Sequence, residues 1–259
     1  MGRFKMISSM VIRNFKSIKN QRLDCKRVNV FIGEPNSGKS NILEVIGLFS
    51  HLYYLKSLRD FVRFETMKDL FYDKVLDFPV EIQFDSKLVE LEFKDGRFKC
   101  RCGNRLIFDY DYHGHGSSIR DSRFSIFKFY RFAKRSEFPD QRSEFLFPPN
   151  GENLVAVILT RKKLRVSIKE IFDDFGYRVV YKPEEGKMEI QKELEDIIFS
   201  LPYPLVSETL QRIIFYLAAI DSNTHSVLAF EEPEAHAFPY YTKFLAERIA
   251  LDKNNNQYF

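Results

Sequence analysis

The sequence predicts a mixed α/β fold. An apolar strand at Val28–Ile32 runs into a stretch of turn-forming residues, and from Lys39 onward apolar side chains recur every three or four residues, as in a helix. The middle of the chain alternates apolar and polar residues, which is typical of half-buried strands. A second short apolar strand, Val227–Phe230, lies between two helical segments near the C-terminus.

The elements of the first half follow in order. A strand at Met10–Ile12 precedes the one at residues 28–32, and the helix begins at Lys39. Asp95-Gly96 separates two alternating runs and favours a type I′ hairpin turn. The strands expected in this β-rich middle are Pro79–Phe84, Leu88–Phe93, Arg97–Cys102, Leu106–Tyr110 and Ile126–Phe132, and residues 114–118 are expected to form a mobile loop.

The second half mixes helices with one further hairpin. No internal repeat and no sustained heptad pattern is present, so no long coiled coil is expected. The expected helices are Glu152–Thr160, Val166–Phe175, one from Ser207 to Ile220, and Tyr240–Ala250, and the expected hairpin joins Tyr177–Tyr181 to Lys187–Gln191.

Composition sets the broad class of protein. Of the 259 residues, 44% are hydrophobic and 29% charged, enough to bury a core, which the 27 Phe residues help to fill. Forty Lys and Arg against 36 Asp and Glu leave a charge of +4, which excludes a polybasic arm as the main feature. The longest apolar run, Ile213–Ile220, is far shorter than the ~20 residues of a membrane span. Three cysteines cannot form a fully paired disulfide framework, so we expect a soluble cytoplasmic protein without a membrane partner.

The turn-rich stretch carries the most specific motif. Gly33-Glu34-Pro35-Asn36-Ser37-Gly38-Lys39-Ser40 fits the pattern G-x-x-x-x-G-K-[ST] and lies between a predicted strand and a predicted helix. Glycines let backbone N–H groups converge on phosphate oxygens at a helix N-terminus. Lys39 can reach the β- and γ-phosphates, and the Ser40 hydroxyl can bind Mg²⁺. The motif therefore predicts a P-loop that binds ATP and Mg²⁺.

Two carboxylates end the strand at residues 227–230. Glu231 is placed to join the Mg²⁺ shell, and Glu232 to orient an attacking water or accept its proton. The alternative is that both acids simply face the dipole of the following helix. The P-loop earlier in the chain favours the first interpretation.

Ser207 opens the helix before that strand and has two interpretations. It could cap the helix by accepting an N–H bond from the first turn, or it could meet a phosphate across a dimer interface. The pattern alone favours the cap.

Residues 120–142 carry seven basic side chains interleaved with aromatic ones. They could form a nucleic-acid surface with stacking platforms. More often such a stretch is a strand with its aromatic face buried and its basic face in solvent. The basic residues are Arg120, Arg123, Lys128, Arg131, Lys134, Arg135 and Arg142.

Several motifs together resemble the RecF, SMC and OLD-like ATPases, most closely the small OLD-like, AAA-domain ATP-binding proteins. The resemblance rests on residues 13–17 (RNFKS), the P-loop with residues 41–44 (NILE), residues 147–154 (FPPNGENL) and residues 230–239 (FEEPEAHAFP). It covers nearly the whole chain, and the two nucleotide motifs are its most specific parts.

The resemblance implies an ABC-type ATPase head: a P-loop NTPase with a mixed central sheet, an antiparallel β-subdomain and a helical lobe. Glu231 then corresponds to the Walker B magnesium acid, Glu232 to the catalytic glutamate and Ser207 to the signature serine. Lys16 and Ser17 occupy the loop near the nucleotide, and Asn41 follows the P-loop.

We expect one head over residues 1–259. Residues 1–132 would form the P-loop core and β-subdomain, 133–206 the helical lobe, and 207–259 the signature helix, the Walker B strand and the last helix. The chain would end at the start of the strand that bears the family's switch histidine. The implied function is Mg²⁺-dependent ATP hydrolysis that drives homodimerisation, in DNA maintenance or antiphage defence, with DNA, a nuclease or a toxin as partner. The alternatives are a small-molecule P-loop kinase and a nucleic-acid-binding module with ATP as a secondary ligand.

Overall fold

The computed structural model of the chain describes residues 5–259, which form two compact units. The first contains the chain up to residue 129 together with residues 225–229 and 256–259, and the second contains residues 130–224 and 230–255. The chain crosses between the units four times, and two of these crossings lie within strands, β8 (Phe127–Arg131) and β12 (Val227–Glu231).

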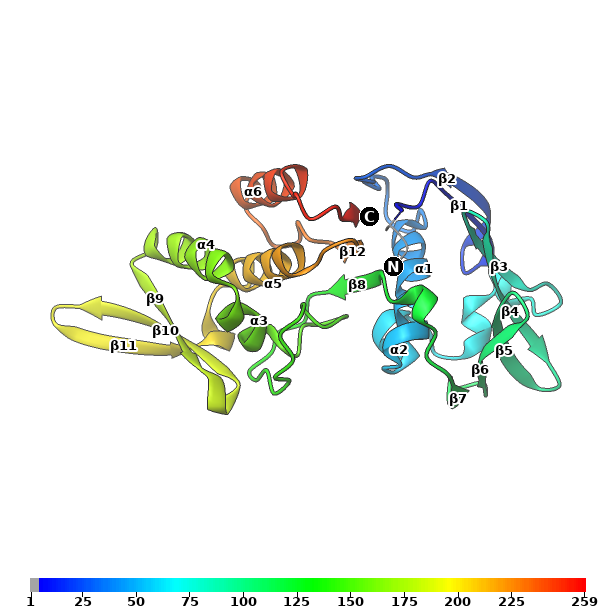
Figure 1. The fold of residues 1–259 in the computed structure, drawn as a ribbon, viewed down its shortest axis with the longest axis horizontal. Coiled ribbons are helices and arrows are strands. Elements are labelled where there is room, and N and C mark those ends of the chain that lie inside the picture. Colours follow the sequence, from blue (N-terminus) through cyan, green and yellow to red (C-terminus); the bar gives the residue numbers. More distant parts are fainter. Residues whose placement is uncertain (1–4) are drawn as a thin grey trace. The chain divides into compact units, whose positions relative to one another are not determined.

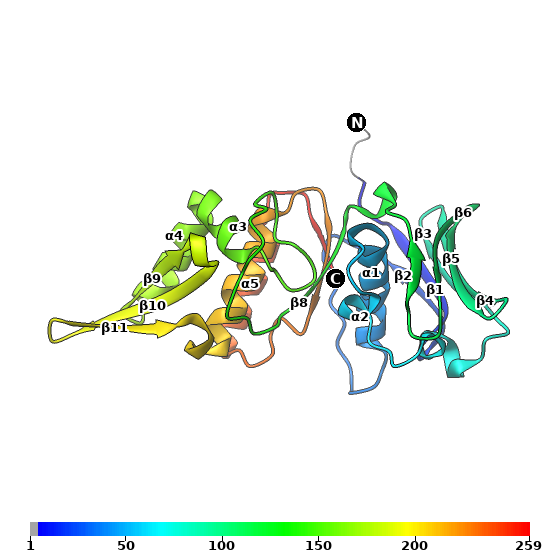
Figure 2. The same cartoon turned by 90° about the horizontal axis from the view of Figure 1, so that it is seen from below.

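The first unit is built on a seven-stranded antiparallel sheet of order β2-β1-β3-β4-β5-β6-β7 (Figure 1). Helix α1 (Lys39–Tyr54) lies against one face of it (Figure 2). The strands are β1 Ser9–Phe15, β2 Ile18–Asp24, β3 Val80–Phe84, β4 Lys87–Lys94, β5 Arg97–Cys102, β6 Arg105–Tyr110 and β7 Gly116–Ser118.

Phenylalanine fills the interface between α1 and the strands. The Phe49 ring of α1 lies 4.9 Å from that of Phe84 and 4.8 Å from that of Phe127, and all three side chains are buried. Gly47 makes the close approach of the next segment possible, since a Cβ there would stand 2.6 Å from the Phe61 carbonyl oxygen of the short helix α2 (Leu58–Phe61). Many of the Phe residues therefore serve the core, as expected, whereas Phe78, Phe175, Phe199 and Phe238 are exposed.

A second sheet, of order β13-β12-β8, provides the parallel pairing. Val227 and Leu228 of β12 lie opposite Gln257 and Tyr258, which form β13. The Gln257 side chain exchanges hydrogen bonds of 2.9 and 2.8 Å with the Ile7 backbone. β12 is buried along its whole length, as its apolar sequence predicts.

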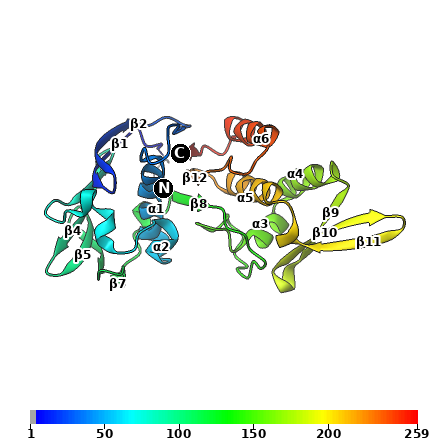
Figure 3. The same ribbon diagram turned by 180° about the vertical axis from the view of Figure 1, so that it is seen from behind.

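The second unit contains four α-helices and the three-stranded sheet β11-β10-β9. In it the β10–β11 hairpin extends beyond α3 and α4 (Figure 3). The elements are α3 Leu154–Thr160, α4 Lys162–Asp173, β9 Tyr177–Lys182, β10 Lys187–Leu194, β11 Ile197–Pro202, α5 Glu208–Ser222 and α6 Pro239–Ala250. The longest helix of the described residues is α1, with 16 residues.

Three sequence expectations were wrong. Residues 28–32 do not form a strand: only Val28 makes an isolated bridge, to Tyr258, because β13 extends over two residues. Val30 and Ile32 are consequently 73% and 91% exposed. Residues 116–118 are not a loop but the edge strand β7. The sequence analysis also missed β2 and β11, since neither alternates apolar and polar residues.

None of the helices within residues 5–259 combines the length and the apolar character that crossing a membrane requires.

Candidate functional site

The P-loop, residues 33–40, lies in the first unit and runs into α1, whose first residue is Lys39. Asn36 and Gly38 adopt left-handed backbone conformations, with φ of 61° and 90°. A Cβ at Gly38 would stand 3.2 Å from the Ser17 Oγ atom. Two features therefore favour glycine at this position: the positive φ, and the close approach of the turn between β1 and β2.

The loop ends at the N-terminus of α1. Gly38 is the N-cap residue, and the first intrahelical hydrogen bond runs from Ile42 N to Gly38 O, at 3.2 Å. The N–H groups of the three residues before Ile42 have no acceptor within the helix. They combine with the helix dipole to favour an anion at this end.

The Lys39 ammonium folds back over the loop. It donates to the carbonyl oxygens of Gly33 and Glu34, at 2.7 and 2.6 Å, and to Ser37 Oγ, at 3.2 Å. All three acceptors are neutral, so the charge of the ammonium is not cancelled by a carboxylate. An incoming phosphate would be a stronger acceptor than a carbonyl.

Ser17 and Asn41 connect the turn to α1, whereas Lys16 is directed elsewhere. The Asn41 side chain donates to Ser17 Oγ at 2.8 Å, beside Gly38. The Lys16 ammonium pairs with the buried carboxylate of Glu44 in α1, which also accepts from Arg63 Nε at 2.7 Å. Glu44 was missed from the sequence, although a charged residue on the apolar face of a predicted helix was the available signal.

Glu231 ends β12 in the second unit and is buried. Its carboxylate accepts from Arg131 Nε of β8, and its backbone oxygen accepts from the Tyr216 hydroxyl at 2.7 Å. The carboxylate is thus held in place by a cation. Arg131 was missed as a site residue, because only the tertiary fold aligns the ends of β8 and β12.

The next residue, Glu232, begins a loop tied to the start of α5. Glu232 has φ of 46° and an exposed side chain, and its carbonyl oxygen accepts from Arg212 at 3.4 Å. The Thr209 hydroxyl donates to His236 O at 2.6 Å. The two acids are not at a helix N-terminus, since α6 begins only at residue 239.

Ser207 immediately precedes α5 in the same unit. Its side chain makes no capping hydrogen bond, so the N-cap interpretation is wrong. The residue instead lines an apolar cavity of about 300 Å³, together with Leu210, Phe238 and Tyr241.

The predicted site residues fall into two sets. Lys16, Ser17 and residues 33–41 belong to the first unit, whereas Ser207, Glu231 and Glu232 belong to the second. Residues 5–259 contain no cluster of three or more His, Cys, Asp or Glu side chains that could enclose a metal ion. Mg²⁺ bound with a nucleotide takes few protein ligands, and a hydroxyl such as that of Ser40 with one carboxylate suits it.

The basic stretch at residues 120–142 is largely neutralised internally. The aromatic side chains of β8 and Phe124 are buried, as the second interpretation requires, so they are no stacking platform. Its basic face is not simply solvated either. The ion pairs are Arg123–Asp121, Arg131–Glu231, Lys134–Glu208, Arg135–Glu152 and Arg142–Asp140, and buried Lys128 donates to Ser226 Oγ.

Comparison with known proteins assigns the family. Residues 6–194 match the AAA ATPase domain, and the chain belongs to this family of P-loop ATPases, whose ligand is ATP. Over 51 residues it is 45% identical to an ATP/GTP phosphatase of Helicobacter pylori (strain ATCC 700392 / 26695). That match spans 19% of this chain and 12% of the relative, so the chain accounts for a small part of that protein's length.

The fold is that of an SMC head. A crystal structure of an SMC head bound to the C-winged helix domain of ScpA matches with a TM-score of 0.60 at 16% identity, over 98% of this chain and 88% of that one. The SMC head domain from Thermotoga maritima matches over the same shares at 13% identity, with a TM-score of 0.46. The first of these matches confirms the predicted fold, a P-loop NTPase of the SMC-head type.

Proposed function

We propose that this domain binds Mg²⁺-ATP on the loop of residues 33–40, hydrolyses it slowly, and joins a second copy of itself while ATP is bound. The observation that carries the proposal is the conformation of the loop. A left-handed glycine directs the chain into α1, and free N–H groups and the Lys39 ammonium gather at the same helix end. Those are the groups that hold a triphosphate.

Each site residue then has a role. Backbone N–H groups of residues 36–41 hold the β-phosphate, and Lys39 exchanges its carbonyl partners for phosphate oxygens. The Ser40 hydroxyl and the Glu231 carboxylate are the proposed ligands of Mg²⁺, which neutralises phosphate charge when bound. The Arg131 guanidinium positions Glu231.

Glu232 is the proposed catalytic base. Its exposed carboxylate would accept a proton from the attacking water, and the hydrogen bond from Arg212 to its backbone oxygen keeps the loop against α5. Ser207 is the proposed contact to the nucleotide of the second copy. The Ser207 hydroxyl supports this role because it makes no capping hydrogen bond to α5. Lys16, Ser17 and Asn41 stabilise the loop from the side of α1.

A nucleotide titration tests the binding site. Lys39→Ala should weaken binding of a fluorescent ATP analogue at least tenfold, since it removes the cation nearest the phosphates. Lys243→Ala is the matched control, because Lys243 is an exposed lysine of α6 whose ion pair with Glu247 lies on the surface. Equal affinities for wild type and Lys39→Ala would remove the proposed site.

Light scattering tests the dimer. Glu232→Gln should trap bound ATP. Its measured mass in the presence of Mg²⁺-ATP should be twice the mass measured without nucleotide. A mass that does not change at saturating Mg²⁺-ATP would exclude ATP-driven pairing.

We propose that the domain acts in DNA maintenance or antiphage defence, with DNA, a nuclease or a toxin as partner. The resemblance to RecF, SMC and OLD-like ATPases supports this setting. ATP hydrolysis that duplex DNA leaves unchanged would weigh against DNA as that partner.

A further inference from the structure

Strand β11 is an open edge of the sheet in the second unit. The order β11-β10-β9 leaves one side of β11 without a neighbouring strand from residues 5–259. All six of its residues are exposed, including apolar ones: Ile197 by 58%, Ile198 by 60% and Phe199 by 50%. The hairpin that carries it extends away from the helices of the unit (Figures 1 and 3).

The other edge strands of the described sheets are protected. Edges are usually blunted by charged side chains or by shortness, because an open edge pairs with other chains. β7 and β13 have three and two residues. β2, β8 and β9 each carry at least two charged side chains. β11, with the sequence IIFSLP, is the one described edge strand longer than three residues that has neither protection.

The hairpin turn decides which backbone groups point outward. Glu195 and Asp196 both have positive φ, 48° and 65°, as in a two-residue type I′ turn, and Leu194 lies opposite Ile197. Such a turn makes 194–197 a hydrogen-bonded pair, and the pairs then alternate along an antiparallel ladder. The outward N–H and C=O groups therefore belong to Ile198 and Ser200. Pro202, which has no N–H, ends this open ladder.

We propose that β11 pairs antiparallel with β11 of a second copy of this chain, about a two-fold axis at Phe199. In that register Ile198 of each copy lies opposite Ser200 of the other. The four outward groups of each strand are thereby all used, in four hydrogen bonds. The two Phe199 rings face each other in a non-hydrogen-bonded pair, and Ile197 lies opposite Leu201, so apolar side chains meet apolar side chains.

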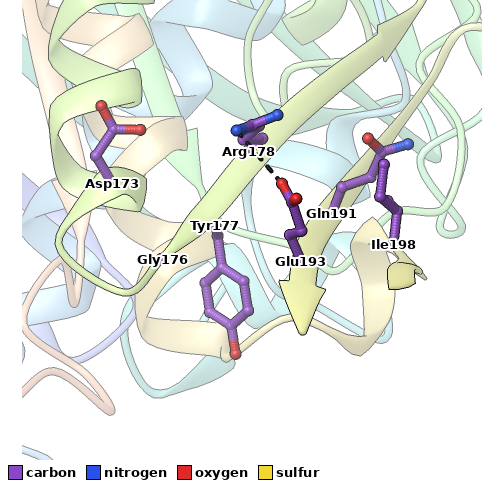
Figure 4. A pocket seen from close by; sticks show the side chains of 7 residues that line it. All are labelled: Asp173, Gly176, Tyr177, Arg178, Gln191, Glu193 and Ile198. Carbon is purple, nitrogen blue, oxygen red and sulfur yellow. Dashed lines mark ion pairs between the residues drawn. The ribbon is translucent and has the colours of Figure 1, made fainter. Parts of the chain in front are cut away.

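On one face of the sheet, the charges beside β11 do not oppose a second copy. On the face that Ile198 shares with β9 and β10, Arg178 and Glu193 form an ion pair 3.6 Å long, and Gln191 is neutral (Figure 4). Their charges cancel, and β11 itself has none. A self-complementary strand without charge suits an identical strand better than a charged peptide, which would find no partner charge along it.

This interface uses other groups than the proposed ATP-driven one, although Leu201 of β11 and Ser207 line the same cavity. It uses backbone groups of β11 and needs no nucleotide, whereas the proposed ATP dimer uses residues 33–41 and Ser207. The two can be told apart by testing self-association without nucleotide, and by testing the response to Mg²⁺-ATP in a variant that lacks the β11 interface.

Sedimentation of the whole chain without nucleotide is the first test. Wild type should show a monomer–dimer equilibrium that depends on concentration, and Ser200→Pro should weaken it at least tenfold, because proline removes an outward N–H without touching the ladder to β10. Ser200→Ala is the matched control: it loses the same 2.7 Å bond from Ser200 Oγ to Glu189 but keeps the N–H, and should dimerise like wild type. A wild type that stays monomeric without nucleotide up to high micromolar concentration, or a dimer that Ser200→Pro leaves unchanged, would overturn the proposal.

Cross-linking tests the register and does not depend on the proline variant. All three native cysteines are buried. Under mild oxidation Phe199→Cys should give a disulfide-linked dimer, since facing Cβ atoms in such a pair lie ~5 Å apart. Ile197→Cys should not, because its two copies are offset by four residues, or about 13 Å. Equal cross-linking of both variants, or none of Phe199→Cys, would refute the register.

Discussion

Replacement of Gly38 by alanine tests whether the loop conformation creates the nucleotide site. Gly38 has φ of 90°, and a Cβ there would stand 3.2 Å from Ser17 Oγ and 3.9 Å from Ile18. Gly38→Ala therefore adds both an unfavourable backbone conformation and a tight contact. Relief requires the turn at Ser17 to move or φ to change, and either would redirect the N–H groups at the start of α1.

Gly96 separates these two effects. It has φ of 75° in the turn between β4 and β5, and a Cβ there would meet nothing within 4 Å. Gly96→Ala should therefore cost only the conformational penalty of an L-residue at positive φ, about 1–2 kcal/mol. Gly38→Ala should lose that amount and up to ~1 kcal/mol more for the contact, by analogy with mild overpacking.

The assay has two readouts. Urea unfolding followed by circular dichroism gives the loss of unfolding free energy for each variant, and titration with a fluorescent ATP analogue gives the affinity. Gly96→Ala should bind like wild type, whereas Gly38→Ala should bind at least tenfold more weakly, equivalent to about 1.4 kcal/mol. Wild-type affinity of a folded Gly38→Ala would refute the argument that the left-handed glycine aligns the phosphate-binding groups.

Three further predictions concern stability. Burial lowers the pKa of Lys128 to about 7, so the folded chain releases this proton at a lower pH than the unfolded chain does. The free energy of unfolding should therefore rise from pH 7 towards pH 10.5, by at most ~1.4 kcal/mol per pH unit. In urea unfolding measured over this pH range, Lys128→Met should flatten the rise. Gly47→Ala should lower the unfolding free energy by about 1–3 kcal/mol, because the Cβ would lie 2.6 Å from the Phe61 carbonyl oxygen. Glu44→Gln should cost about 3 kcal/mol, at the low end for a broken buried pair because Arg63 is half-exposed.

Each of these predictions has a contradicting outcome. A rise with pH that persists in Lys128→Met would assign it to another group. A Gly47→Ala chain as stable as wild type would mean that α2 moves aside without cost. Glu44→Gln unfolding at the wild-type urea midpoint would show that the pairs with Lys16 and Arg63 add nothing net.

Local sequence patterns predicted the parts of the fold that local physics governs. The helix from Lys39, the Asp95-Gly96 hairpin and the apolar strand before Glu231 were predicted because period, turn chemistry and burial agree there. The strand at residues 28–32 was wrong because a strand exists only with a partner, and β13 provides one residue pair. β11 was missed because an exposed apolar strand shows no alternation for a pattern to detect.

The sequence by itself determined that this chain carries a P-loop: the spacing of Gly33, Gly38, Lys39 and Ser40 can be read without any tertiary contact, because the loop and the helix that follows it are one continuous segment. Only the tertiary structure decided that the Lys16 ammonium goes to Glu44, that Arg131 holds Glu231 and that β11 remains an open edge. The first two facts join residues far apart in the chain, and the third depends on which strands lie side by side. A local sequence pattern contains neither kind of information.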